Sequence, residues 1–220
     1  MTRSTASVSA ATALALVIVP VVLAGDGKPQ IRFTAAGQAA ARAAVLRRSD
    51  LGSSAWQGGS VKPDLTSTVN CPSFHPKQSD LVVTGAAETA FHRSSVEFSS
   101  VAEILRTKRM VSLDWRRSVV PGAAVTCLRR TLANGLPTGA RIVSFARAPF
   151  PRVGRGSTRF HGVVRIDVLG RTARLVTDIV ILYRSRTEIT LSATGPASAA
   201  ASLLGAERRL ARVLVSRARA

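Results

Sequence analysis

The strongest constraint on the fold is a strict two-residue alternation of side chains between residues 159 and 194. In the first run, apolar residues or glycine alternate with charged or polar residues: Phe160, Gly162, Val164, Ile166 and Val168 against Arg159, His161, Arg165 and Asp167. Runs over 174–184 and 187–194 repeat the pattern, and Gly170-Arg171 is typical of a tight turn. A period of two indicates antiparallel strands with one face on the core and one face in water.

The remaining sequence places helices around this sheet. We expect helices over 34–48, from Ser99 or Ser100 to 117, over 123–133 and over 197–217. Further strands are expected over 81–93, 96–98 and 141–147, whereas Ser49–Ser79 is rich in loop-forming residues, with at most one turn of helix. The predicted order is α-β-β-α-α-β-β-β-β-α, an α+β fold in which an antiparallel sheet of about five to six strands is covered by helices.

The last expected helix is amphipathic. One face carries Leu203, Leu210 and Leu214, and arginines crowd the other side. A helix of this kind usually covers a sheet, and a membrane-surface helix is the alternative.

The first 24 residues have the three parts of a secretory signal peptide. Met1–Ala10 carries one charge, Ala11–Leu23 is almost wholly apolar, and Val22-Leu23-Ala24 fits the small-x-small cleavage pattern. A spanning helix needs roughly 20 apolar residues, which favours cleavage over an uncleaved anchor. We expect a signal peptide at 1–24, a short linker at 25–33 and a single α+β domain at 34–220, secreted or otherwise outside the cytoplasmic membrane, with no membrane span after cleavage.

The two cysteines, Cys71 and Cys127, are the only ones in the chain. In an oxidising compartment they should form one disulfide, and two separate buried thiols are the alternative. The bond would close a loop of about 57 residues and stabilise the fold by roughly 4 kcal/mol in the chain-entropy model.

The chain is strongly basic. It carries 31 Lys and Arg against 12 Asp and Glu, a formal net charge of +19 at pH 7. Such a charge attracts polyanions, so anionic envelope polymers and lipid headgroups are candidate partners. Nucleic acid is disfavoured because the arginines are not interleaved with stacking aromatic residues. A solvated basic surface without a dedicated site is the simpler interpretation, and no feature of the sequence indicates an oligomeric state.

The elements predicted over roughly residues 80–217 follow a distinctive layout. It combines a strand pair and helix with Trp115, the helix of Cys127, the linker 149–154, a three-strand meander and a closing helix. In this layout the chain resembles the extracytoplasmic sensor-like domains of actinobacterial envelope proteins: the outer domain of PknH-type receptor kinases and related lipoproteins of PsbP-like fold. The resemblance implies an envelope sensor-like module. The chain has one Cys pair where the kinase outer domain has two, and no site residues are carried over.

Catalytic motifs are absent from the sequence. No G-x-S-x-G elbow is present, and His75 stands in a loop with only Ser73 or Asp80 as conceivable partners. His92 and His161 have no metal-ligand spacing, and the two cysteines are too far apart for a redox pair. We therefore expect no enzyme activity, no catalytic residues, no metal and no cofactor, and an unrecognised hydrolase remains an alternative.

A candidate ligand rim is formed by two loops rich in Pro and Gly, 56–76 and 149–158. Arg152, Arg155 and Arg159 recur there with small residues between them, an arrangement that suits an anionic ligand. Trp56 is either a ligand platform or, as we favour, a plug for the core. The sequence thus predicts an exported, non-enzymatic cell-envelope binding or sensor-like module with a strongly basic surface. The alternative is an electrostatic adhesion protein for anionic wall or membrane polymers.

Overall fold

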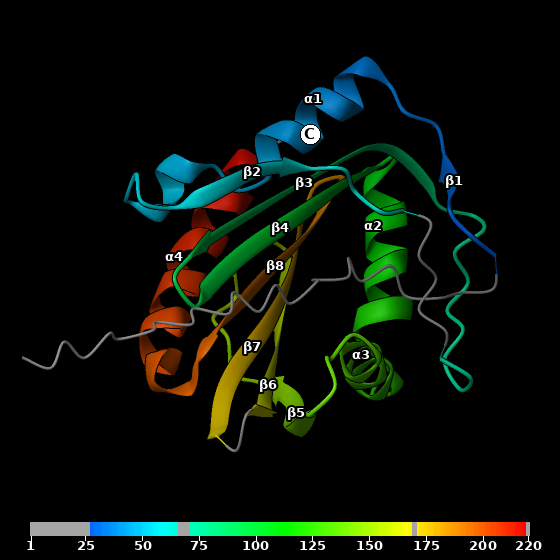
Figure 1. The fold of residues 1–220 in the computed structure, drawn as a ribbon. Helices are drawn as coiled ribbons and strands as arrows, with labels where there is room; N and C mark the ends of the chain where they lie inside the picture. The colour runs from blue at the N-terminus through cyan, green and yellow to red at the C-terminus, as the bar shows by residue number, and fades with distance from the viewer. Residues whose placement is uncertain (1–26, 66–70, 169–170, 219–220) are drawn as a thin grey trace, which may run out of the picture.

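The computed structural model describes residues 27–65, 71–168 and 171–218. Within them the chain is an α+β protein built on one mixed, mostly antiparallel sheet of eight strands (Figure 1). The strands are β1 (Gln30–Ile31), β2 (Gln57–Val61), β3 (Val82–Arg93), β4 (Val96–Leu105), β5 (Ala140–Ala148), β6 (Gly156–Val168), β7 (Arg171–Arg184) and β8 (Thr187–Pro196). Their order is β1-β3-β4-β8-β7-β6-β5; β1 pairs with β3 in parallel, and β2 adds to β3 antiparallel.

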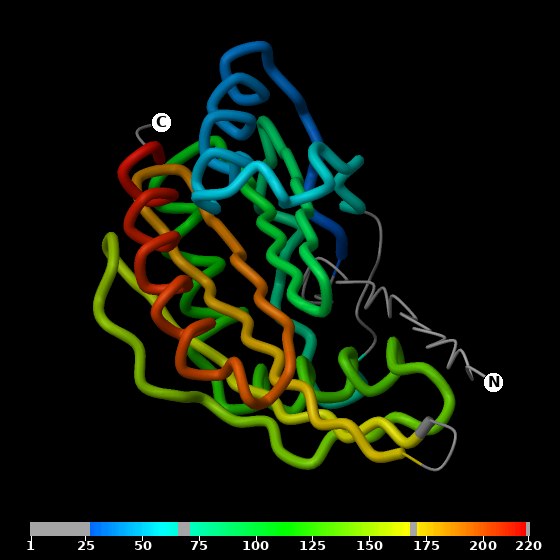
Figure 2. Tube along the Cα trace, turned by 60° about the vertical axis from the view of Figure 1, so that its left-hand side comes forward, coloured from blue at the N-terminus to red at the C-terminus, as the bar shows by residue number. Residues whose placement is uncertain are grey.

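Helices cover both faces of this sheet. They are α1 (Ala35–Ala44), α2 (Lys108–Asp114), α3 (Ala123–Asn134) and α4 (Ala200–Arg217). Short 3-10 helices lie at Arg48–Leu51 and Ala197–Ala199, and a π-helical segment, Trp115–Val119, continues α2. Helices α1 and α4 lie side by side on one face, and α2 and α3 lie on the other (Figures 1 and 2).

The expectation of one wet sheet face is therefore wrong for the centre of the sheet. On β7, Val180 faces α1 and α4, whereas Ile179 and Ile181 belong to the apolar cluster under α3. The continuous buried run on β7 is typical of a strand covered on both sides. Buried residues alternate with more exposed ones on β6 over 162–167 and at the start of β8 over 187–191, whereas β7 is exposed throughout 171–174. Gly170 of the expected turn lies outside the described residues.

The second expected helix begins later than its sequence indicates. Residues Ser99 and Ser100 do not cap a helix but lie within β4, which continues to Leu105. The Ser100 hydroxyl accepts a hydrogen bond from the Leu46 N–H at 2.8 Å, so its polar group is satisfied inside the sheet. The actual N-cap is Thr107, whose Oγ1 accepts from the N–H of Met110.

The region expected to be loop, Ser49–Ser79, contains the additional strand β2. Its glycines concealed this strand, because glycine is poor in strand interiors. Here glycine allows close pairing: Gly58 has φ 116°, and a Cβ on it would lie 2.1 Å from the carbonyl oxygen of Ala90 on β3.

Helix α1 begins where the sequence predicts, with Thr34 accepting a hydrogen bond from the Gly37 N–H. It packs unusually close to β3, since a Cβ on Gly37 would lie 2.1 Å from the carbonyl oxygen of Thr84. Packing of helix backbone against strand backbone here leaves no room for a side chain.

Substituting Gly37→Ala should therefore lower the free energy of unfolding, by about 1–3 kcal/mol as for other overpacked sites. The control is Gly205→Ala on α4, where no atom lies within 4 Å of the added Cβ. That variant should gain up to about 1 kcal/mol from helix propensity. Urea denaturation of both variants measures the difference, and equal midpoints would contradict the close packing of α1.

Two further expectations concern export. The disulfide Cys71–Cys127 is present and joins the loop before β3 to α3. Within the described ranges, no helix is both long enough and apolar enough to cross a membrane. The expected signal peptide at 1–24 lies outside the described residues.

Candidate functional site

The four residues of the expected ligand rim do not come together. Trp56 is 5% exposed and lies in the core, with its ring centroid 5.6 Å from that of Phe98 and the Arg93 guanidinium 5.1 Å above it. It is part of the packing between β2, β3 and β4 and offers no surface to a ligand.

Arg159 also departs from the expected rim. It lies on β6 under α4 and is only 7% exposed. Its Nη2 donates to Asp178 Oδ2 at 2.8 Å, and its Nε lies 3.2 Å from Glu207 Oε2. The guanidinium therefore neutralises internal carboxylates and is not available to an external anion. We call Arg159, Asp178 and Glu207 the buried charge cluster.

Arg152, in contrast, lines an open groove that sequence reasoning did not assemble. The linker between β5 and β6 runs along α4 (Figure 2), and together they enclose a groove of about 820 Å³. Its arginines come from three elements: Arg152 from the linker, Arg184 from β7, and Arg208 and Arg212 from α4. We call this the basic groove.

The wall of the basic groove is apolar between these arginines. Pro149, Phe150, Pro151, Val153 and Val215 line it. Arg155 lies outside it, in a neighbouring hollow of about 360 Å³ beside Lys108, Arg109 and Arg184. Guanidinium groups above an apolar wall can bind an anionic head attached to an apolar or sugar-like body.

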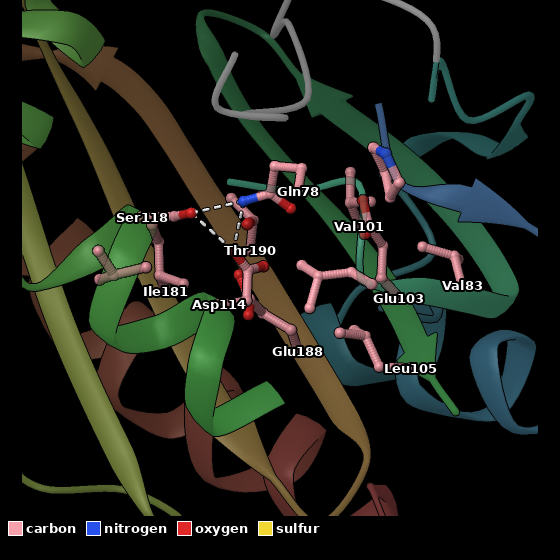
Figure 3. A pocket seen from close by; sticks show the side chains of 13 residues that line it. Gln78, Val83, Val101, Glu103, Leu105, Asp114, Ser118, Ile181, Glu188 and Thr190 are labelled. Atoms are coloured by element: carbon pink, nitrogen blue, oxygen red, sulfur yellow. Dashed lines mark hydrogen bonds between the residues drawn. The ribbon is translucent and has the colours of Figure 1, made fainter. Parts of the chain in front are cut away.

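The opposite face of the sheet carries a second arrangement, which the sequence analysis missed. Glu103 on β4 and Glu188 on β8 are directly paired across the strands, and Asp114 of α2 faces them. Figure 3 shows Asp114 and Glu188 side by side beneath Gln78 and Ser118. We call the cavity lined by Glu103, Asp114 and Glu188 the acidic recess.

Asp114 is held in place by neutral donors. Gln78 Nε2 donates to its Oδ1 at 2.8 Å, and Ser118 Oγ donates to the same oxygen at 2.6 Å. The Gln78 amide also reaches Ser118 Oγ at 2.7 Å. These bonds fix the carboxylate that α2 contributes to the recess.

Burial disturbs the protonation of this recess. Burial, with repulsion from Asp114, raises the pKa of Glu103 to about 7. Burial, with repulsion from Asp114 and Glu103, raises the pKa of Glu188 well above its usual range. Burial also raises the pKa of Asp114, against the hydrogen bonds from Gln78 and Ser118. The recess thus gathers several carboxyl groups that cannot all be ionised without a compensating cation.

The described part of the chain contains no group of three or more His, Cys, Asp or Glu residues arranged to hold a metal ion. His75, considered as a catalytic base, is exposed and contacts the carbonyl oxygen of Pro72 through Nε2 at 3.0 Å.

The chain is thus a two-sided α+β sandwich with a basic groove on one side and an acidic recess on the other. No family model matches it, and no curated protein matches it. Among solved structures, it is similar to an uncharacterised protein of Mycobacterium smegmatis at 15% identity, covering 76% of this chain and 91% of that one, with a TM-score of 0.42.

Two further structures are more distant. LpqN of Mycobacterium tuberculosis, described as involved in cell envelope biogenesis, is 11% identical over 72% of this chain and 76% of that one, with a TM-score of 0.29. The Ran-binding protein Mog1p of Saccharomyces cerevisiae is 14% identical over 59% of this chain and 77% of its own, with a TM-score of 0.30. These are distant likenesses of layout, and the proposals below depend on the residues of this chain alone.

Proposed function

We propose that this protein is an exported, non-enzymatic module of the cell envelope that binds anionic polymers or lipid headgroups in the basic groove. The observation that carries the proposal is the convergence of Arg152, Arg208 and Arg212 on one apolar-walled groove. Arginine binds phosphate and carboxylate through paired N–H donors, and a partly apolar wall adds burial of the ligand body.

The setting of the groove supports this proposal. The net charge of +19 draws anionic surfaces toward the protein from a distance. A disulfide is typical of proteins that leave the reducing cytoplasm, which agrees with an extracytoplasmic location.

The proposal predicts that the triple variant Arg152→Ala, Arg208→Ala, Arg212→Ala binds phosphatidylglycerol vesicles at least roughly tenfold more weakly, since each charged hydrogen bond contributes about 1.5–3 kcal/mol. Co-sedimentation at two salt concentrations measures the affinity and its electrostatic part.

The matched control removes three exposed arginines outside the groove, Arg129, Arg130 and Arg174, and so makes the same change in net charge. It should lose much less affinity. Equal losses from both triple variants would mean that net charge alone attracts the surface, as in an adhesion protein without a site.

A further inference from the structure

We propose that the acidic recess binds a primary ammonium group carried on an alkyl chain, as in a lysine side chain of a peptide or a free diamine. This inference does not depend on the basic groove, which lies on the other side of the sheet.

The first support is the pairing of like charges without a cation. Glu103 and Glu188 face each other across β4 and β8, an arrangement that destabilises a sheet when both are ionised. Glu188 Oε2 is buried and has no hydrogen-bond partner, and no ion pair joins a described cation to either glutamate. The recess therefore holds a buried acceptor oxygen, Glu188 Oε2, that its own side chains do not satisfy.

The second support is a further carboxylate on the same sheet face. Glu88 is only 8% exposed and pairs across the strands with Val101, which lines the recess. Among the described residues, no hydrogen bond or ion pair satisfies its carboxylate. Burial, with repulsion from Asp64, raises the pKa of Glu88 to about 7, so its ionisation adds negative charge to the sheet face that carries the recess.

The size and walls of the recess favour an alkylammonium ion. The cavity volume is about 40 Å³, and one water-sized group needs about 10–15 Å³ on the same measure, so an ammonium head with its first methylenes fits. Leu81, Val83, Val101 and Leu105 provide apolar walls for the methylenes. An ammonium group has three donors, which suits carboxylates arriving from β4, β8 and α2.

Binding should be coupled to proton release. Burial and the neighbouring charges of Asp114 and Glu103 raise the pKa of Glu188 well above its usual range, which favours its protonated form until a cation binds. The other charged groups that act on them are Glu103, which repels Glu188, and Arg117, which attracts Asp114 and is itself paired with Asp80. An ammonium ion stabilises the ionised carboxylates and displaces protons, so its affinity should rise as pH rises through about 7, the pKa of Glu103.

The experiment is isothermal titration of the protein with cadaverine and with a lysine-containing peptide, each near pH 6 and near pH 8. We expect at least one of the two amines to bind, roughly tenfold tighter near pH 8 than near pH 6, with proton release measured in buffers of different ionisation enthalpy. The peptide with its lysine acetylated should not bind. Preference for the peptide over cadaverine assigns the ligand to a protein or peptide chain, and the reverse assigns it to a free amine.

The double variant Glu103→Gln, Glu188→Gln should lose at least roughly tenfold in amine affinity. It keeps side-chain shape, and its thermal denaturation verifies that it is folded. The matched control is Glu97→Gln, which removes a charge from the same strand and face but does not line the recess. Unchanged affinity in the double variant, equal loss in the control, no binding of either amine, or a calcium ion binding in place of both amines would each overturn the proposal.

Discussion

Replacing Arg159 by leucine should lower the free energy of unfolding by about 3–5 kcal/mol, the usual cost of removing one partner from a buried ion pair. The substitution would leave Asp178, which is 1% exposed, and Glu207, which is fully buried, facing each other without the guanidinium. The remaining partner of the pair is the His161 ring, whose Nδ1 lies 2.7 Å from Asp178 Oδ1. Urea denaturation near pH 7 measures the change. The exposed Arg152→Leu is the control, with an expected change within about 0.5 kcal/mol.

The whole buried charge cluster should be replaceable even though its single members are not. Burying ions is itself expensive, so apolar groups of similar volume often do as well or better. The triple variant Arg159→Met, Asp178→Leu, Glu207→Leu should recover most of the stability lost by the single substitution. If Arg159→Leu alone lowers the free energy of unfolding by less than about 1 kcal/mol, the buried charge cluster does not stabilise the fold as proposed.

The same cluster predicts a dependence of stability on pH. The Arg159 guanidinium donates a hydrogen bond to Asp178, whereas its contact with Glu207 lacks hydrogen-bond geometry. Burial and repulsion from Asp178 raise the pKa of Glu207 to about 8, against the attraction of Arg159. The folded protein holds this proton where the unfolded chain releases it, so the contribution to stability falls as pH rises from about 4.5 to about 8. Glu207→Gln should remove this fall, and an unaltered pH profile would contradict it.

The predicted elements that hold are those set by local chemistry. Thr34 caps α1 because its hydroxyl satisfies a free helix N–H. Helix α3 ends at Asn134, within one residue of the expected 133, although Gly135 stays in the right-handed region and forms no left-handed cap. The long strands from β6 to β8 follow from alternation alone. The continuation of β4 through Ser99 and Ser100 could not be found this way, because a serine that caps a helix and one that bonds inside a sheet look alike in sequence.

The candidate sites could be predicted less well than the helices and strands, because they depend on how distant segments of the chain pack together. Arg152 was expected at a ligand rim, but its partners on α4 stand about 60 positions away in the chain and are brought together only by packing of the linker on the helix. The acidic recess could not be predicted either, because residue 103 was expected in a helix. Only the continuation of β4 and its register with β8 bring Glu103 opposite Glu188.

Loss of the disulfide should have the second large effect. The bond closes a separation of 56 residues, and its removal from an exported domain of this size usually costs about 2–5 kcal/mol. Both sulfur-bearing side chains are buried in the cluster of Phe74, Leu128 and Phe160, so the double variant Cys71→Ala, Cys127→Ala also loses packing. Reduced wild-type protein separates the two contributions, because it keeps the side chains and loses only the bond. Denaturant midpoints that do not change on reduction would contradict a stabilising role.

The disulfide also restrains the segment that supplies Gln78. The disulfide attaches Cys71, at the start of the loop that leads to Gln78, to Cys127 on α3. Gln78 in turn donates a hydrogen bond to Asp114 at the acidic recess. Reduction of the disulfide frees the loop between Cys71 and Gln78 and so raises its conformational entropy. The loop must lose this entropy again when an amine binds in the recess. Reduction should therefore weaken cadaverine or lysine-peptide binding even at temperatures where the reduced protein stays folded.

The variant Gln78→Leu, with the disulfide intact, should also weaken amine binding, because the Asp114 carboxylate loses the hydrogen bond that positions it. Full amine affinity in both cases would mean that Asp114 is positioned by Ser118 and α2 alone.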